Sequence, residues 1–255
     1  MIPAANILQP LIDVANGVLQ FFHDNVGLSW GMSIIALTVV TRAVLIPLTY
    51  KQLKGMRALQ ALQPQIKELQ EKYKNDKQRM QQEMMRFYKE NKVNPFASCI
   101  PLLAQLPVFI TLFYVLRHEL PPDMGCPEAG HCAAYGAEFF FINDLTAKAT
   151  GSELIVLLVL YVGTQLISGM VMSLSADKSQ RTMMFLLPLI FVPFILSFPA
   201  GLILYWITTN IWTIGQQFAI QKLVPVPVPA TLEGAAAIAA AKPPPPPPRK
   251  KKKRR

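Results

Sequence analysis

Five long apolar segments constrain this chain of 255 residues more than any other feature. An α-helix needs about 20 consecutive apolar residues to cross the hydrocarbon core of a bilayer. The segments that approach this length are residues 28–50, 95–117, 152–173, 183–199 and 201–221. Because backbone groups in lipid must bond to one another, such segments cross a membrane as helices. The sequence therefore predicts an all-α integral membrane protein with five transmembrane helices.

The distribution of charge predicts how these helices are oriented. Residues 51–92 carry eleven Lys or Arg and five acids, whereas residues 117–153 carry two Lys or Arg and six acids. Basic segments stay in the cytoplasm. We therefore expect residues 51–92, the loop 174–182 and the tail 222–255 to be cytoplasmic. Residues 1–27 and the loop 118–151 are then outside, so the N-terminus is outside and the C-terminus is cytoplasmic.

The pattern of apolar residues in segment 51–92 predicts a cytoplasmic antiparallel helical hairpin. Apolar residues recur there at steps of three and four, stop at Asn75–Asp76 and then resume, which is typical of two packed helices. The recurring residues are Leu59, Leu62, Ile66, Leu69, Tyr73, Met80, Met84 and Phe87. Pro64 predicts a kink in the first arm.

The two ends of the chain differ in character. Apolar residues of segment 1–27 recur at helical spacing, which predicts an amphipathic helix on the outer membrane surface. The segment has no basic start, so we do not expect it to be a cleaved signal. The tail 222–255 is rich in Pro and ends in RKKKKRR, which predicts a disordered segment. A cationic end of this kind binds polyanions, either anionic lipids or the RNA of a ribosome; on a multi-pass protein we do not expect DNA.

Cys126 and Cys132 lie in the outer loop 118–151 and flank the segment CPEAGHC. An oxidising compartment favours a disulfide between them. The alternative is a metal site that also uses His131, but three potential ligands without a fourth are a weak metal signal.

Arg42 lies inside the first apolar segment and predicts a functional site. An arginine at that depth costs at least ~2.5–3.5 kcal/mol, and such residues usually serve a function. Lys51 follows nine residues later, which puts Arg42 roughly 13 Å from the cytoplasmic end of the segment. Within the five segments the one acidic residue is Glu153, at the outer end of segment 152–173. We therefore expect a hydrated cavity open to the cytoplasm, with amides and hydroxyls around the guanidinium. The candidates that share this cavity are Thr38, Gln105, Gln165, Tyr205, Trp206 and Thr209.

Three stretches of the chain resemble the membrane core of the YidC family of membrane-protein insertases. They are SWGMSIIALTVVTRAVLIPLTYKQ, LQPQIKELQEKYKNDKQRMQQEMMRFYKENKVNPFASCIPLLAQLPVFITLFYVLR and FPAGLILYWITTNIWTIGQQ, and the likeness extends over residues 28–222. It implies a five-helix core with a hydrophilic groove, in the bacterial plasma (inner) membrane. It implies that Arg42, Thr38 and Gln105 line the groove and that Tyr205 and Trp206 contact substrate; Gln165 is added from its spacing.

The resemblance also implies a function that is not enzymatic. The protein would receive nascent membrane proteins in the groove and release their helices into the bilayer, without nucleotide hydrolysis and without a cofactor. The implied partners are these clients, the ribosome and the Sec translocon, although this sequence contains no large outer domain of the kind through which Gram-negative members would contact the translocon. A small transporter or anion channel is the rival interpretation of Arg42, and a structural scaffold is a third.

Overall fold

The computed structural model describes residues 3–91, 93, 100–173 and 178–223. The described residues form helices and loops and contain no β-strand, only two isolated bridges. The all-α class is therefore confirmed. The described residues divide into two compact units, one within residues 1–56 and 94–225 and the other within residues 57–93.

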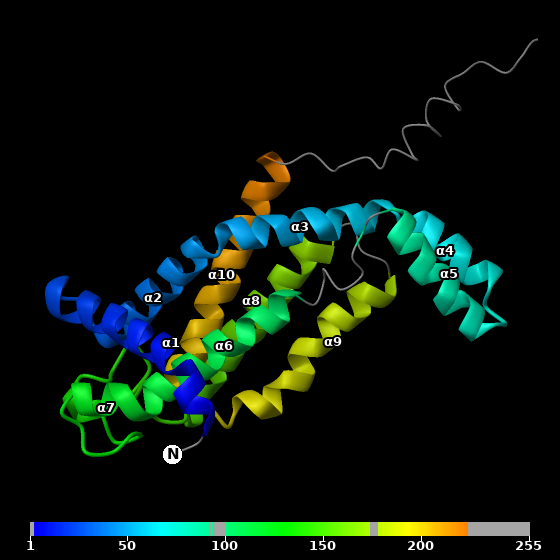
Figure 1. Cartoon of the computed structure of the whole chain (residues 1–255). Coiled ribbons are helices and arrows are strands. Elements are labelled where there is room, and N and C mark those ends of the chain that lie inside the picture. The colour runs from blue at the N-terminus through cyan, green and yellow to red at the C-terminus, as the bar shows by residue number, and fades with distance from the viewer. Residues whose placement is uncertain (1–2, 92, 94–99, 174–177, 224–255) are drawn as a thin grey trace, which may run out of the picture. The chain divides into compact units, whose positions relative to one another are not determined.

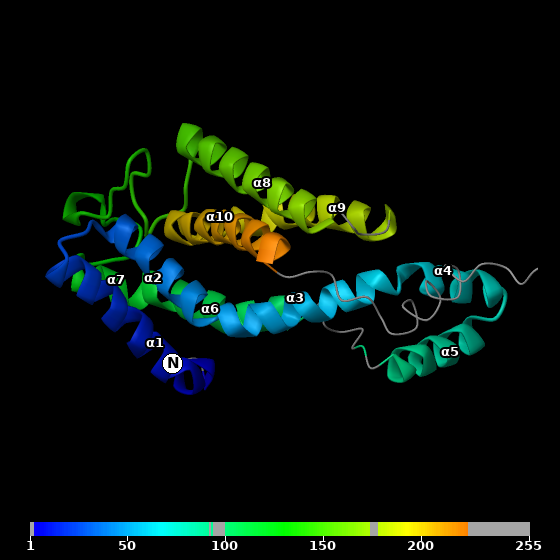
Figure 2. The same cartoon turned by 90° about the horizontal axis from the view of Figure 1, so that it is seen from above.

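The first unit contains most of the helices (Figure 1). They are α1 (Pro3–Gln20), α2 (Trp30–Val44), the start of α3 (Ile46–Ala61), α6 (Ile100–Tyr114), α7 (Leu120–Asp123), α8 (Gly151–Ser173), α9 (Lys178–Ile195) and α10 (Ala200–Leu223). Helix α10 packs along both α8 and α2, and Figure 2 shows it between them. Helix α9 packs on α8, and α1 packs on α2 and α6.

The first apolar segment is a bent pair of helices. Ser29 caps α2 by accepting a hydrogen bond from the Met32 amide. Helix α2 ends at Val44, and α3 leaves it at an angle of 57°. Pro47 is the second residue of α3, a position where the amide hydrogen that proline lacks has no helical partner. The helix pair bends where the proline prevents a straight continuation.

One helix among the described residues, α8 over Gly151–Val171, is by itself long and apolar enough to cross a bilayer. The bent pair formed by α2 and Ile46–Gln52 meets the same measure if it is taken as one span. The count of five transmembrane helices therefore stays a prediction.

The loop before α8 is bonded to the start of α10. The Ala200 amide donates to the Ala147 carbonyl at 2.7 Å, and the Gly201 amide donates to the Leu145 carbonyl at 2.9 Å. These bonds satisfy two amides that a helix start leaves without a partner. Glycine fits at position 201 without displacing a neighbour, whereas a Cβ atom there would lie 2.9 Å from the Leu145 oxygen.

A small polar network holds this loop in shape. The buried Asp144 carboxylate accepts hydrogen bonds from the Cys132 amide at 2.7 Å, the Thr146 amide at 2.8 Å and the Thr146 hydroxyl at 2.7 Å. Cys126 and Cys132 form a disulfide, with their Cα atoms 5.5 Å apart. Their sulfur atoms are bonded to each other and so are not thiolate ligands. Asp144 and Thr146 flank Leu145 in the sequence. Their hydrogen bonds therefore fix the Leu145 carbonyl that accepts from the Gly201 amide of α10.

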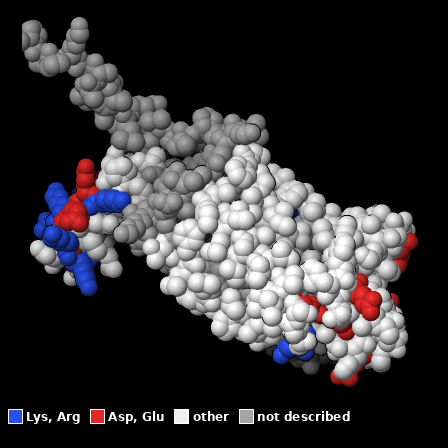
Figure 3. Space-filling view, turned by 180° about the vertical axis from the view of Figure 1, so that it is seen from behind, with Lys and Arg blue, Asp and Glu red and all other residues white. Residues whose placement is uncertain are grey.

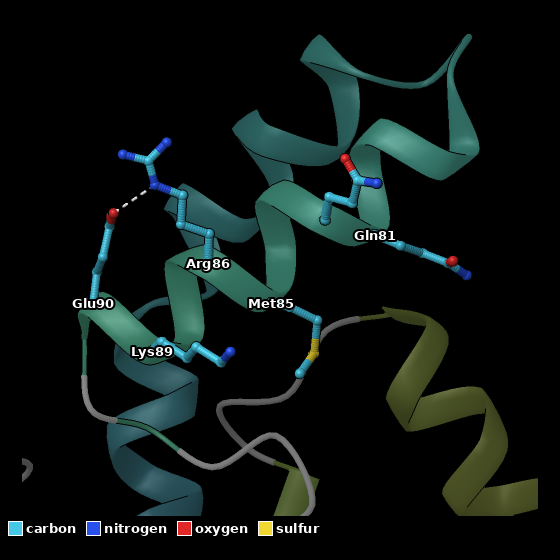
Figure 4. Close-up of a pocket in the computed structure, with 6 residues that line it drawn as sticks. Gln81, Met85, Arg86, Lys89 and Glu90 are labelled. Atoms are coloured by element: carbon cyan, nitrogen blue, oxygen red, sulfur yellow. Dashed lines mark hydrogen bonds and ion pairs between the residues drawn. The ribbon is translucent and has the colours of Figure 1, made fainter.

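The second unit is a helical hairpin of α4 (Gln63–Lys72) and α5 (Lys77–Glu90), which pack on each other. Pro64 lies in the first turn of α4, so the helix is interrupted at Leu62 rather than only kinked. Asp76 caps α5 by accepting from the Arg79 amide. Figure 4 shows the Arg86–Glu90 ion pair on one side of α5, and Met85 projects from the helix away from that ion pair.

Candidate functional site

A chain of hydrogen bonds joins three helices around Arg42. The guanidinium Nη2 of Arg42, near the end of α2, donates to Oε1 of Gln105 on α6 at 2.9 Å. Nε2 of Gln105 then donates to the hydroxyl of Tyr205 on α10. The three side chains come from segments about 60 and 100 residues apart in sequence. The structure therefore brings together the arginine, the amide and the phenol that the sequence predicts at one site.

No carboxylate among the described residues pairs with Arg42. Ion pairs among the described residues include Lys74–Glu71 and Arg86–Glu90, both in the second unit. Arg42 is half-buried and bonds to a neutral amide. A guanidinium has five N–H donors; Gln105 accepts from one of them, and the neutral Tyr205 hydroxyl is a second neighbour. The site therefore keeps a positive charge with free donor capacity.

Thr209 adds a buried hydroxyl to this site. It lies one helical turn after Tyr205 on α10, and its side chain is 7% exposed. Its Oγ1 atom lies beside the Tyr205 hydroxyl and makes no hydrogen bond of regular geometry among the described residues. Burying a hydroxyl without a partner costs about 1–3 kcal/mol. The position therefore favours a polar group or a water molecule beside Tyr205.

Thr38 is placed differently from Thr209. It lies one turn before Arg42 and is 1% exposed, and its hydroxyl donates to the Ile34 carbonyl of its own helix at 2.7 Å. That bond uses its only proton, so Thr38 has acceptor capacity alone for a ligand. Thr38 thus contributes a small, buried surface next to Arg42.

Trp206 belongs to an aromatic cluster rather than to the hydrogen-bonded chain. Its ring stacks on Phe109 of α6, with centroids 5.1 Å apart and planes inclined by 23°. Phe198 and Tyr161 lie at 6.2 Å and 6.0 Å from it. Trp206 follows Tyr205 on α10, so the same helix carries both this apolar cluster and the polar site.

Gln165 of α8 is half-buried, and its side chain makes no hydrogen bond within the part of the chain that is described. The neighbouring Thr164 accepts a bond from Asn210 of α10 at 3.3 Å, which links α8 to α10. The sequence does not single out Thr164, nor the buried hydroxyls of Ser33 and Thr111, which have no partner among the described residues. Hydroxyl residues inside apolar segments are the signal that finds them.

Comparison with known proteins gives consistent matches. The profile of the family described as "60Kd inner membrane protein" matches residues 21–226. A protein of Streptomyces avermitilis named "Membrane protein insertase YidC" is 36% identical, over 82% of this chain and 55% of the relative. A protein of the same name from Mannheimia succiniciproducens is 39% identical, over 85% of this chain and 37% of the relative.

A solved structure also matches. It is described as "Active YidC insertase crystal structure with the first transmembrane domain resolved", and the match has a TM-score of 0.63 and 25% identity. It covers 84% of this chain and 46% of that one. The chain thus spans about half, or less, of the length of the proteins that it matches.

Proposed function

Because the chain belongs to the 60Kd inner membrane protein family, which is the family of the membrane protein insertase YidC, we propose that it inserts other proteins into a bacterial membrane. Its clients are nascent membrane proteins. The observation that carries the proposal is the hydrogen-bonded chain of Arg42, Gln105 and Tyr205, which places a charge without a carboxylate partner among apolar helices.

Arg42, Gln105, Tyr205 and Thr209 form the receiving site in this proposal. Each has spare hydrogen-bonding capacity or bonds only to a neutral partner. Such a site solvates a polar segment of a client that otherwise faces hydrocarbon, where each unsatisfied polar group costs several kcal/mol. The positive charge of Arg42 favours client segments that carry an acidic residue. The site is a hydrated groove open to the cytoplasm and to lipid.

The aromatic cluster around Trp206 is the second part of the site. A client's apolar helix leaves the groove along this surface and along the exposed apolar face of α8, which includes Ile155 and Val159. Transfer of apolar surface out of water releases about 25 cal/mol per Å². A helix of bilayer length therefore drives its own release into lipid, and nucleotide hydrolysis is not needed.

The remaining segments act in recruitment. In the orientation expected from charge, the helical hairpin and the basic tail face the cytoplasm. The hairpin meets clients, and the tail binds ribosomal RNA or anionic lipids. The helix α1 lies at the outer surface, and cooperation with a Sec translocon adds a further partner.

Reconstituted insertion tests this proposal. Purified protein in liposomes is given a ribosome-bound client with one acidic outer segment, and protease protection measures insertion. The Arg42–Gln105 hydrogen bond is charge-assisted and contributes about 1.5–3 kcal/mol. We expect Arg42→Ala to lower the insertion rate by about tenfold to a hundredfold and Arg42→Lys to lower it less.

Arg117→Ala is the matched control, since Arg117 lies over the Phe113 ring and has no hydrogen bond to Arg42, Gln105 or Tyr205, and it is expected to leave insertion unchanged. Wild-type insertion by Arg42→Ala would remove the role given to the charge. Flux of small anions through the same liposomes, lost in Arg42→Ala while insertion persists, would favour an anion carrier instead.

A further inference from the structure

An aromatic turn projects from the loop that precedes α8. The Phe139 amide donates to the Ile142 carbonyl and the Ile142 amide donates to the Phe139 carbonyl, both at 2.8 Å. These bonds close a two-residue turn with Phe140 and Phe141 at its tip. Phe140 is 89% exposed and Phe141 is 43% exposed. No other large hydrophobic side chain among the described residues is as exposed as Phe140.

The backbone at Phe140 is strained. Its φ angle is 52°, and it is the one non-glycine residue with positive φ in the described ranges. A turn with positive φ at its first central residue usually has glycine there. A bulky residue in this conformation is rare and commonly marks a functional site. In return Phe140 gains only an edge contact with the Phe139 ring, with centroids 4.6 Å apart, and its own ring stays exposed.

Phe139 fixes the turn against the first turn of α2. Its ring is buried on Gly31, the second residue of α2, where a Cβ atom would lie 2.2 Å from the ring carbon Cγ. A side chain at position 31 therefore excludes this packing. Figure 1 shows the loop at the end of the first unit where α2 begins. The tip thus lies level with the point at which the first apolar segment starts.

The surroundings favour lipid as the occupant of this surface. The tip is held level with the start of an apolar helix, and aromatic side chains are enriched at that level of a bilayer. Acidic side chains gather at the same end of the first unit (Figure 3). In the sequence, the exposed Glu138 lies two residues before Phe140. Negative charge around the tip opposes adsorption to anionic headgroups, so contact is made through the rings.

We propose that Phe140 and Phe141 form a lipid anchor that enters the interfacial layer of the outer leaflet and sets the depth of α2. Arg42 follows Gly31 by eleven residues on the same helix, which is about 16 Å along its axis. With the tip at the interface, Arg42 lies about half-way through a hydrocarbon core of about 30 Å. The anchor therefore fixes the level at which the charge is presented, a property beyond the insertion function and independent of it.

Fluorescence quenching tests the anchor in liposomes of zwitterionic lipid. Phe140→Trp adds one indole to the three that the chain contains, and the difference from wild-type emission isolates it. Lipids brominated near the headgroup end of their acyl chains are expected to quench most of the added emission, while aqueous iodide quenches little of it. Glu128→Trp, an exposed site between the two cysteines, is the control and is expected to respond to iodide alone.

Iodide quenching of Phe140→Trp equal to that of Glu128→Trp would overturn the anchor, as would bromine quenching at both positions. Circular dichroism and insertion activity show whether each variant is folded. An active Phe140→Trp protein whose added indole is quenched by aqueous iodide would refute the anchor alone. A lipid-quenched indole in a wild-type background that inserts no client would refute only the insertase proposal.

Discussion

The replacement of Gly201 by alanine tests how the loop holds α10. The new Cβ atom would lie 2.9 Å from the Leu145 oxygen, 3.0 Å from Cδ2 of Leu116 and 3.3 Å from Cδ1 of Ile34. Ordinary contact begins near 3.4 Å, so the loop must move by 3.4 − 2.9 = 0.5 Å. That movement lengthens the bond from the Gly201 amide to the same oxygen.

The expected loss of stability follows from these contacts. Overpacking costs about 1–3 kcal/mol and a weakened buried hydrogen bond about 1 kcal/mol. The higher helix propensity of alanine returns up to about 1 kcal/mol. We therefore expect Gly201→Ala to lower the free energy of unfolding by about 1–3 kcal/mol. Denaturant titration in detergent, followed by circular dichroism, measures this difference.

Gly215→Ala is the matched control on the same helix. A Cβ atom at position 215 meets nothing within 4 Å, so alanine there is expected to leave stability unchanged or to raise it by up to about 1 kcal/mol. If Gly201→Ala were as stable as Gly215→Ala, the bond between the loop and α10 would not be the constraint described here.

Two further predictions concern the site and the loop. Tyr205→Phe removes the acceptor of the Gln105 amide and is expected to lower the free energy of unfolding by about 1–3 kcal/mol and to slow client insertion; unchanged thermal unfolding and insertion would contradict the bridge. Replacing Cys126 and Cys132 by serine removes the disulfide, whose cysteines are six residues apart in sequence, and is expected to lower the free energy of unfolding by about 2 kcal/mol. A reductant added to wild-type protein should lower the unfolding midpoint similarly. An unchanged midpoint in both experiments would contradict the stabilising role of the disulfide.

The sequence predicts the helical class because long apolar segments leave few other structures open to a chain in lipid. It also identifies Arg42, Gln105 and Tyr205, since charged and polar residues inside apolar segments are rare enough to stand out. Their meeting at one point depends on how α2, α6 and α10 are rotated. Composition does not give that rotation, because apolar residues surround each helix and no single face is marked.

Other features depend on contacts between distant residues. Pro47 accounts for the position of the bend in the first segment, but a proline does not by itself give the angle of 57°. Gly31 and the Phe139 ring that packs on it are more than 100 residues apart in sequence, so no local pattern reveals their contact. Trp206 follows Tyr205 in sequence, yet its ring packs on Phe109, because adjacent helical residues point in different directions.

Photocrosslinking to a stalled client tests the central claim most directly. A benzophenone side chain at position 205 replaces Tyr205 in the receiving site, and one at the exposed position 159 of α8 is the control for lipid-facing surface. A client stalled with its acidic outer segment at the membrane is expected to crosslink to position 205. As the client lengthens, its crosslinks are expected to appear at position 159. Crosslinks at position 159 at every length, with none at position 205, would contradict entry through the Arg42 site.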